Sequence, residues 1–244
     1  DIGTSDNTGP AITFNSLNYD NNQLTVGLNE KAYDANSGSG DLEVGDFALS
    51  ITNGVATIGS ATPTSISRIG DHQYVLGFSL SGTPNGSEQL AVVPIANSIF
   101  DINGTASSAS QSNNTVNLFE KVLPTISSTA LAADNSTITA TFSEAVFKSR
   151  SASGTGFAGN GDLEVNDFVL SMSGGVATLG SATPTSISKS SNAYTLGINY
   201  IGLPNGSEVI TVIPAQDAIY DNTGNIASTT QSNNTKTFNS EKIR

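Results

Sequence analysis

Apolar and polar residues alternate in short runs along the whole chain, a pattern that predicts β-strands rather than helices. Segments 24–28, 47–51 and 74–80 each place an apolar residue at every second position, and turn-forming pairs such as Asn53-Gly54 separate the runs. Helix is expected only as a turn near residues 96–100. Seven short strands with turns between them predict an antiparallel β-sandwich.

One part of this pattern leaves two interpretations open. Residues 55–58 and 65–68 both have the character of strands, and Pro63 lies between them. Proline lacks the N–H that a strand needs for its ladder. The segment 55–68 is therefore expected to form either one kinked strand or two; counted as one, it is the fourth of the seven strands A to G.

The whole pattern occurs twice along the chain. Residues 40–47, Gly-Asp-Leu-Glu-Val-Gly-Asp-Phe, recur at 161–168 as Gly-Asp-Leu-Glu-Val-Asn-Asp-Phe, an offset of 162 − 41 = 121 residues. The segment Pro-Asn-Gly-Ser-Glu at 84–88 recurs at 204–208. A repeat of this length is far longer than a solenoid unit, so each copy is expected to be a domain with its own core.

The predicted fold is all-β, as two tandem immunoglobulin-like antiparallel β-sandwiches. The predicted organisation is a leader at 1–9, a first sandwich at 10–119, a short linker at 120–123, a second sandwich at 124–238 and a tail at 239–244. The linker contains no Gly or Ser, which favours a semi-rigid tandem. The second copy has extra Gly, Ser and Ala residues around 148–160, expected to lie on an exposed loop.

Composition narrows the classes of function. The formal net charge is −12 and only 12% of the 244 residues are charged, which argues against nucleic acid or an anionic membrane as partner. No run of residues is long and apolar enough to insert in a membrane. There is no cysteine, so the cores must suffice without disulfides, and no thiolate metal site is present.

Three segments of the second copy carry a family resemblance. They are Thr-Phe-Ser-Glu-Ala-Val at 141–146, Asp-Phe at 167–168 and Asp-Asn-Thr-Gly-Asn at 221–225. They resemble bacterial immunoglobulin-like repeats of large secreted or surface-attached, adhesin-type proteins. The resemblance covers nearly the whole chain, although the first copy departs from it at 28–32 and 101–105. It implies serial repetition, an extracellular location, and a role in adhesion or spacing, often with bound calcium.

Acidic residues gather in the loop between the second and third strands and in the loop between the last two strands. These B–C and F–G loops share one end of an immunoglobulin-like sandwich. Converging carboxylates repel unless a cation lies among them, and calcium takes about six to eight oxygen ligands in irregular loops. The candidate calcium ligands are Glu30, Asp41, Asp46, Asp101 and Asn103 in the first copy and Glu144, Asp162, Asp167, Asp221 and Asn222 in the second.

Two other interpretations of these residues stay open. Asp and Glu side chains also cap loop amides, as in Asx turns. Alternatively, Asp46 and Asp167 only cap the entry to the third strand of each copy. Calcium binding, loop capping and strand capping are therefore three separate predictions for the same residues.

Catalysis is not expected from this sequence. His72 is the only histidine and lies in a predicted turn, and no Ser-His-Asp arrangement surrounds it. We expect a non-catalytic spacer or adhesion segment of an extracellular protein, whose partners are neighbouring repeats and a cell-surface or polysaccharide ligand. The alternative is a carbohydrate-binding accessory module of a secreted polysaccharide-acting enzyme. The chain has no Trp, so the candidate sugar platforms are Tyr19, Tyr33, Tyr200 and Tyr220.

Overall fold

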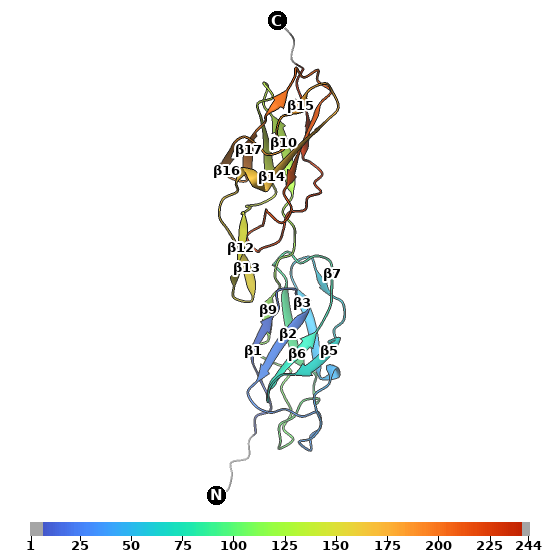
Figure 1. The fold of residues 1–244 in the computed structure, drawn as a ribbon. Helices are drawn as coiled ribbons and strands as arrows, with labels where there is room; N and C mark the ends of the chain where they lie inside the picture. The colour runs from blue at the N-terminus through green and yellow to red at the C-terminus, as the bar shows by residue number, and fades with distance from the viewer. Residues whose placement is uncertain (1–6, 241–244) are drawn as a thin grey trace. The chain divides into compact units, whose positions relative to one another are not determined.

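The structure is a computed structural model that describes residues 7–240. Residues 1–6 of the predicted leader and 241–244 of the predicted tail lie outside the described residues. The chain divides into two compact units, unit 1 (Asp1–Val122) and unit 2 (Leu123–Arg244), each built of β-strands (Figure 1). The described residues contain no α-helix and so no helix that could cross a membrane.

Unit 1 is a sandwich of two antiparallel sheets. The first sheet has four strands in the order β1 (Ile12–Leu17), β2 (Gln23–Leu28), β6 (Gln73–Gly77) and β5 (Ser65–Arg68). The second has the order β3 (Phe47–Thr52), β8 (Gln89–Pro94) and β9 (Thr115–Asn117), and a short 3₁₀ turn, η1 (Val44–Asp46), leads into β3. Four strands facing three in this order is the immunoglobulin-like arrangement, so the predicted fold class is confirmed.

Unit 2 repeats the same plan. Its four-stranded sheet has the order β10 (Ile126–Leu131), β11 (Thr137–Phe142), β17 (Ala193–Gly197) and β16 (Ile187–Ser190). Its three-stranded sheet has the order β14 (Phe168–Ser173), β19 (Val209–Pro214) and β20 (Thr235–Thr237), with η2 (Val165–Asp167) before β14. The duplicated sequence has therefore folded into duplicated architecture.

The segment 55–68 forms two strands, which belong to different sheets. In unit 1 β4 (Thr57–Ile58) pairs with β7 (Leu80–Ser81), while β5 pairs with β6. Unit 2 has the matching pair β15 (Thr178–Leu179) and β18 (Tyr200–Ile201). The expected continuous strand 74–80 is consequently broken after Gly77. The alternation runs through this break because the apolar side chains still face the core, although the backbone has changed partners.

The extra residues of unit 2 form a hairpin where we expected a loop. Strands β12 (Ser149–Ser153) and β13 (Gly156–Asn160) pair in register from end to end, and Gly154 turns the chain with φ +60°. The guanidinium of Arg150 lies 4.2 Å from the centre of the Phe157 ring and donates to the Gly224 carbonyl at 2.7 Å. These contacts stabilise the hairpin, whose other residues are mostly small.

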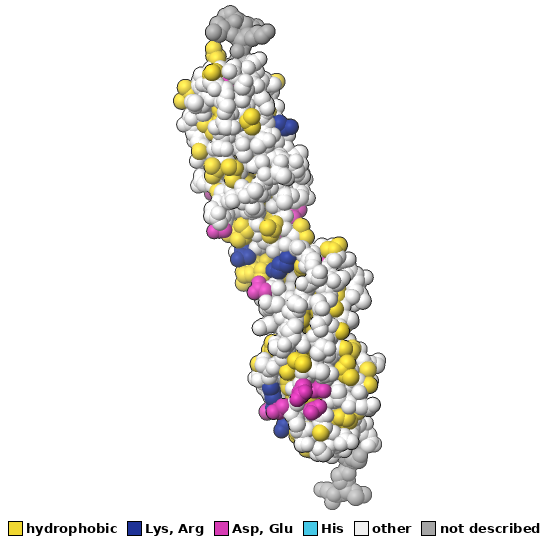
Figure 2. Space-filling view, turned by 90° about the vertical axis from the view of Figure 1, so that its right-hand side faces the viewer, with side chains coloured by type: hydrophobic (Ala, Val, Ile, Leu, Met, Phe, Trp, Pro, Cys, Tyr) yellow, Lys and Arg dark blue, Asp and Glu magenta, His cyan; other side chains and the backbone are white. Residues whose placement is uncertain are grey.

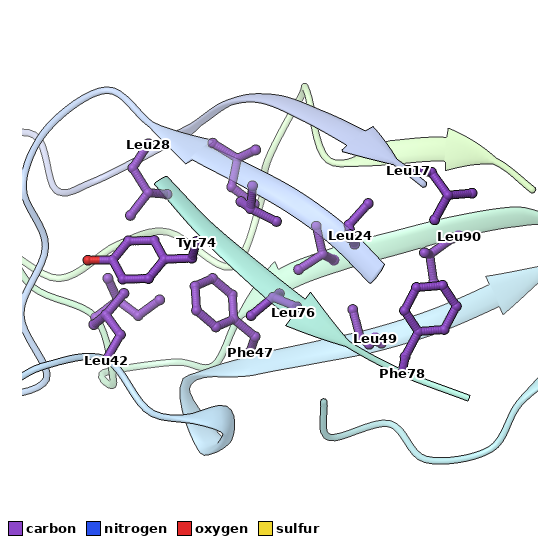
Figure 3. Packing of buried hydrophobic residues seen from close by; sticks show 14 of the residues in the cluster. Leu17, Leu24, Leu28, Leu42, Phe47, Leu49, Tyr74, Leu76, Phe78 and Leu90 are labelled. Carbon is purple, nitrogen blue, oxygen red and sulfur yellow. The ribbon is translucent and has the colours of Figure 1, made fainter. Parts of the chain in front are cut away.

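Each unit has its own aromatic core. In unit 1 the rings of Phe47 and Tyr74 lie side by side between the sheets (Figure 3), with centroids 6.5 Å apart. In unit 2 Phe142, Phe168 and Tyr194 form a mutually packed trio with centroid separations of 5.9 to 6.3 Å. Burial of these side chains supplies the main stabilisation that each sandwich needs in the absence of disulfides.

Candidate functional site

The two loops that carry the predicted ligands do meet at one end of each unit. In unit 1, Tyr33 of the B–C loop and Phe100 of the F–G loop exchange two backbone hydrogen bonds, both 2.9 Å. In unit 2, Phe147 and Tyr220 exchange the same pair at 2.7 and 2.8 Å. The loop ends are thus tied together by backbone bridges, and the acidic side chains are distributed around them.

Asp46 and Asp167 cap the 3₁₀ turns that lead into the third strand of each unit. The Oδ2 atom of Asp46 accepts the Glu43 amide at 2.6 Å, and that of Asp167 accepts the Glu164 amide at 2.7 Å. Burial raises the pKa of both carboxyls although these amides oppose the shift. In unit 1 the charges of Asp34 and Glu43 raise the pKa of Asp46 further. The strand-capping interpretation describes these two residues.

Asp101 and Asp221 are fully buried and fold their F–G loops around themselves. The Oδ1 atom of Asp221 accepts the amides of Thr223 and Asn225, both at 2.8 Å, and its Oδ2 accepts the side-chain amide of Asn225 at 2.8 Å. The Oδ1 atom of Asp101 accepts the amides of Asn103 at 2.8 Å and Thr105 at 2.6 Å. Both carboxylates therefore act as Asx-type loop caps.

The remaining predicted ligands are exposed or half-buried. Asp41 is exposed, with an oxygen 3.9 Å from Arg68, and Asp162 is exposed, with an oxygen 3.1 Å from Lys189. Such exposed ion pairs contribute little to stability. The side chains of Asn103 and Asn222 are exposed, and those of Glu30 and Glu144 are half-buried.

The donor set for calcium is incomplete in both units. Within residues 7–240, no group of three or more His, Cys, Asp or Glu side chains is placed to hold a metal ion. The Oδ2 atom of Asp101 is the one buried side-chain polar atom in that range without a hydrogen-bond partner, whereas Asn225 occupies the matching oxygen in unit 2. Calcium therefore stays a prediction, and Asp101 is the donor that fits it best.

Comparison with known proteins gives two distant structural likenesses. No protein-family model and no curated protein matches this chain. The N-terminal part of the bacterial S-layer protein SbsC is 12% identical, with a TM-score of 0.33, over 90% of this chain and 44% of that chain. A chimeric titin Z1Z2-Z1Z2 tandem with an exogenous GRGDS peptide from fibronectin is 14% identical, with a TM-score of 0.21, over 89% of this chain and 98% of that chain. The chain thus spans less than half of the S-layer fragment, and neither likeness assigns it a family or a role.

At the opposite end of each unit lies a buried glutamate that the sequence reasoning missed. Glu88 is fully buried, and its two oxygens accept four backbone amides, those of Val55, Ala56, Asn85 and Gly86, at 2.8 to 3.2 Å. Glu208 does the same in unit 2 with Val176, Ala177, Asn205 and Gly206. Each glutamate joins the turn before β4 or β15 to the turn before β8 or β19, so we call it the glutamate clamp.

The clamp is electrostatically strong. Burial by itself would raise the pKa of Glu88. The hydrogen bonds from the backbone amides of Ala56 and Val55, together with those from other amides, have a larger effect and lower the pKa to about 2. A carboxylate that accepts several backbone N–H groups is strongly favoured in its charged form. The signal was present in the sequence, because Pro-Asn-Gly-Ser-Glu occurs in both copies. A turn at Pro-Asn-Gly accounts for the first three residues of this segment but not for the glutamate.

Proposed function

We propose that this chain is a non-catalytic tandem of immunoglobulin-like units in an extracellular bacterial surface or secreted protein, where it acts as a spacer or adhesion segment. The observation that supports this best is the way in which the backbone enters and leaves each unit. A spacer must add its own length to the chain, which requires entry and exit at opposite ends. It must also hold both ends firmly.

Unit 1 meets both requirements. At the entry, the amide of Ile12 donates to the side-chain oxygen of Gln111 at 2.7 Å. At the exit, the amide of Phe119 donates to Asn21 Oδ1 at 2.9 Å, and Asn21 Nδ2 donates back to the Phe119 carbonyl at 2.7 Å. Asn21 is buried in the turn that follows β1, so β1 separates entry from exit.

Unit 2 has the same two kinds of hydrogen bond at its entry and at its exit. Ile126 donates to the side-chain oxygen of Gln231 at 2.8 Å at the entry. Asn135 and Asn239 exchange two hydrogen bonds, of 2.8 and 2.9 Å, at the exit. Asn21 and Asn135 both have a left-handed backbone, with φ of 54° and 59°, which asparagine tolerates better than most residues. Each unit therefore extends the chain from one end of its first strand to the other.

The connection between these anchors is short. The amide of Lys121 donates to the Pro84 carbonyl of unit 1 at 2.9 Å, and the amide of Thr125 donates to the Ser143 hydroxyl of unit 2 at 3.1 Å. Only residues 122–124 lie between these two hydrogen bonds, and one of them is proline. A connection of this length with no glycine supports the predicted semi-rigid tandem.

Limited proteolysis with trypsin tests the anchored exit, because Lys121 is a cleavage site at the connection. We expect the bond between Lys121 and Val122 to resist cleavage in the native protein, as followed by mass spectrometry. The Asn21→Ala variant removes both hydrogen bonds to Phe119 and should make this bond cleave faster. Rapid cleavage after Lys121 in the unchanged protein, before any cleavage inside the units, would contradict a held connection.

Calcium enters this proposal as a stiffening ion. It would bind the acidic loops at the entry end of unit 1, where Asp101 has an oxygen to offer and Ser107 of the same loop donates to the Pro10 carbonyl, and it would stiffen that end and not the connection at residues 122–124. Isothermal titration with calcium should give heat, and the melting temperature should be higher in calcium than in chelator. The Asp101→Asn variant should lose both effects. No heat and equal melting temperatures would remove calcium from the account while leaving the spacer role untouched.

A further inference from the structure

Asparagine is followed directly by glycine at five places in the chain, which are 53–54, 85–86, 103–104, 160–161 and 205–206. In such a pair the backbone nitrogen of the glycine can attack the side-chain carbonyl carbon of the asparagine, because glycine has no side chain to block the approach. The attack requires a glycine N–H that can give up its proton and an asparagine side chain that is free to turn. The five pairs differ in both respects, so the fold decides which of them can react.

The pair Asn53-Gly54 meets both requirements. It forms the exposed bend between β3 and β4, with φ of 63° at Asn53 and 65° at Gly54. These two strands belong to different sheets, and the amide of Val55 donates to Glu88 Oε1 at 2.8 Å instead of closing a turn. Within residues 7–240, neither the Asn53 side chain nor the Gly54 N–H has a hydrogen-bond partner. Both reacting groups are therefore free and accessible to water.

The glutamate clamps hold two of the other pairs. The Gly86 N–H donates to Glu88 Oε2 at 3.0 Å, and Asn85 Oδ1 accepts the amide of Ser87 at 3.0 Å. The matching pair of unit 2, at 205–206, has the same two bonds at 3.0 and 2.9 Å. Removing the proton from either glycine amide would place a second negative charge beside a buried carboxylate, which electrostatic repulsion opposes. Hydrogen bonding and charge therefore both protect these pairs.

The remaining two pairs are restrained in other ways. The Gly104 N–H donates to the Asp101 carbonyl at 3.2 Å, in the loop that folds around the buried Asp101 carboxylate. Acidic side chains gather at this end of unit 1 (Figure 2), and their charge also opposes loss of the Gly104 proton. Asn160 pairs with Ser149 in the β12–β13 hairpin, and its carbonyl accepts the Ser149 hydroxyl at 2.9 Å. The backbone at Asn160 therefore cannot turn unless the end of the hairpin opens.

We propose that Asn53 is a site of spontaneous deamidation in the folded protein and that the other four Asn-Gly pairs are protected from it. The Gly54 nitrogen gives up its proton to water or hydroxide and bonds to Asn53 Cγ. The bond from Cγ to Nδ2 then breaks, and the leaving nitrogen takes up a proton and departs as ammonia. Water opens the resulting succinimide ring at either of its two carbonyl carbons. The product is aspartate, or isoaspartate, in which the main chain runs through the side-chain carbons.

The reaction acts on the glutamate clamp of unit 1. Isoaspartate adds one carbon to the main chain at residue 53, directly before the amides of Val55 and Ala56 that donate to Glu88. A Cβ atom at Gly54 would lie 2.3 Å from Glu88 Cδ, so the bend has no room to shift towards the glutamate. The added carbon should therefore displace one or both of these donors and weaken the clamp.

Unit 2 is exempt from this reaction. Gly174 and Gly175 stand at the positions that match Asn53 and Gly54, with φ of 73° and 62°. The same left-handed bend is thus built there without an asparagine. The inference goes beyond the spacer role, which needs no covalent change, because it gives one unit a chemical modification that weakens it with time and that the other unit lacks.

Peptide mass spectrometry of the aged full chain tests the proposal. The protein is kept at mildly alkaline pH, digested with trypsin and fragmented by electron transfer, which distinguishes isoaspartate from aspartate. Cleavage after Lys31 and Arg68 places Asn53 on a peptide without any of the other four pairs. We expect Asn53 to convert about tenfold faster or more than Asn85, because the attack at Asn85 must first break a hydrogen bond to a charged group. In denaturant all five pairs should convert at similar rates, which shows that the selectivity comes from the fold.

The variant Asn53→Gly is the matched control, since it installs the residue pair that the same fold holds in unit 2. After ageing, the melting temperature of unit 1 should fall by about 4 °C or more in the unchanged protein, as expected for one lost hydrogen bond, and should stay constant in Asn53→Gly. Equal native conversion of Asn53 and Asn85 would overturn the proposal. So would an Asn53 that stays intact while the denatured chain converts, or a melting temperature that is unchanged after full conversion. None of these results bears on the limited proteolysis that tests the spacer role.

Discussion

Asn225 donates a side-chain hydrogen bond of 2.8 Å to the Oδ2 atom of Asp221 and thereby completes the pairing of a fully buried carboxylate. Unit 1 has no such partner, because Thr105 stands at the corresponding position (225 − 105 = 120) and leaves the Oδ2 atom of Asp101 unpaired. An unpaired buried polar atom costs about 1 to 3 kcal/mol. The two units therefore differ in whether one defined buried oxygen has a hydrogen-bond partner.

This difference predicts that Thr105→Asn stabilises unit 1. The introduced amide would donate to Asp101 Oδ2 as Asn225 does to Asp221, which should contribute about 1 kcal/mol and raise the melting temperature of unit 1 by about 4 °C. Differential scanning calorimetry of the full chain measures it. The reciprocal Asn225→Thr variant is the control and should lower the melting temperature of unit 2, because it also removes the bond to Thr223 Oγ1. An unchanged or lower value for Thr105→Asn would show that the Asp101 oxygen is not the weak point.

The glutamate clamp predicts a second, larger effect. In Glu88→Gln, an NH₂ group replaces one acceptor oxygen and faces backbone N–H groups that have no other partner. Because buried donors would then face one another, the substitution should destabilise unit 1 by about 3 kcal/mol and lower its melting temperature by about 10 °C. Asp71→Asn, at an exposed carboxylate 3.4 Å from Arg68, is the matched control and should change little. Equal effects of the two substitutions in chemical denaturation would rule the clamp out.

The clamp also fixes the acid stability of the protein. The pKa of Glu88 and that of Glu208 lie at about 2 in the folded protein, against 4.5 for the free group. Their contribution is therefore fully present above pH 4.5 and is lost as the pH falls towards 2. Asp46 and Asp167, whose pKa is raised by burial, act in the opposite direction at mildly acid pH. We expect melting temperatures to fall between pH 4.5 and 2, and the Glu88→Gln variant to show a flatter curve for unit 1. A wild-type curve without this fall would contradict the assignment.

Much of the architecture could be predicted from the sequence because it depends on local signals. Alternation of apolar and polar residues predicted the segments that form β2, β3 and β6, and the sequence repeat predicted two copies of one fold. The meeting of the B–C and F–G loops followed from the strand count. Where prediction erred, tertiary pairing decided the outcome. The alternation at 74–80 continues across the break after Gly77, since burial and not hydrogen bonding sets that pattern.

The candidate site was harder to predict because its residues interact over long sequence distances. Asp101 and Asp221 were chosen as metal ligands for their charge, but backbone amides a few residues away already occupy much of their bonding capacity. The burial of Glu88 depends on the amides of residues 55 and 56, which donate to it. The position of the Phe14 ring in β1 depends on Gly27 of β2, over which it lies. None of these pairs has a periodic signature, so each becomes visible only once the strands are in register.

The central claim is that the chain holds a defined spacing, and a distance measurement between the units tests it most directly. The chain has no cysteine, so Ser67→Cys and Ser188→Cys, both exposed and equivalent in the repeat (188 − 67 = 121), accept spin labels at unique positions. Double electron–electron resonance on the full chain, with calcium and with chelator, then gives the distribution of label separations. The account predicts one narrow distribution of label separations in both conditions. A distribution as broad as that of two bodies on a free tether in both conditions would contradict it.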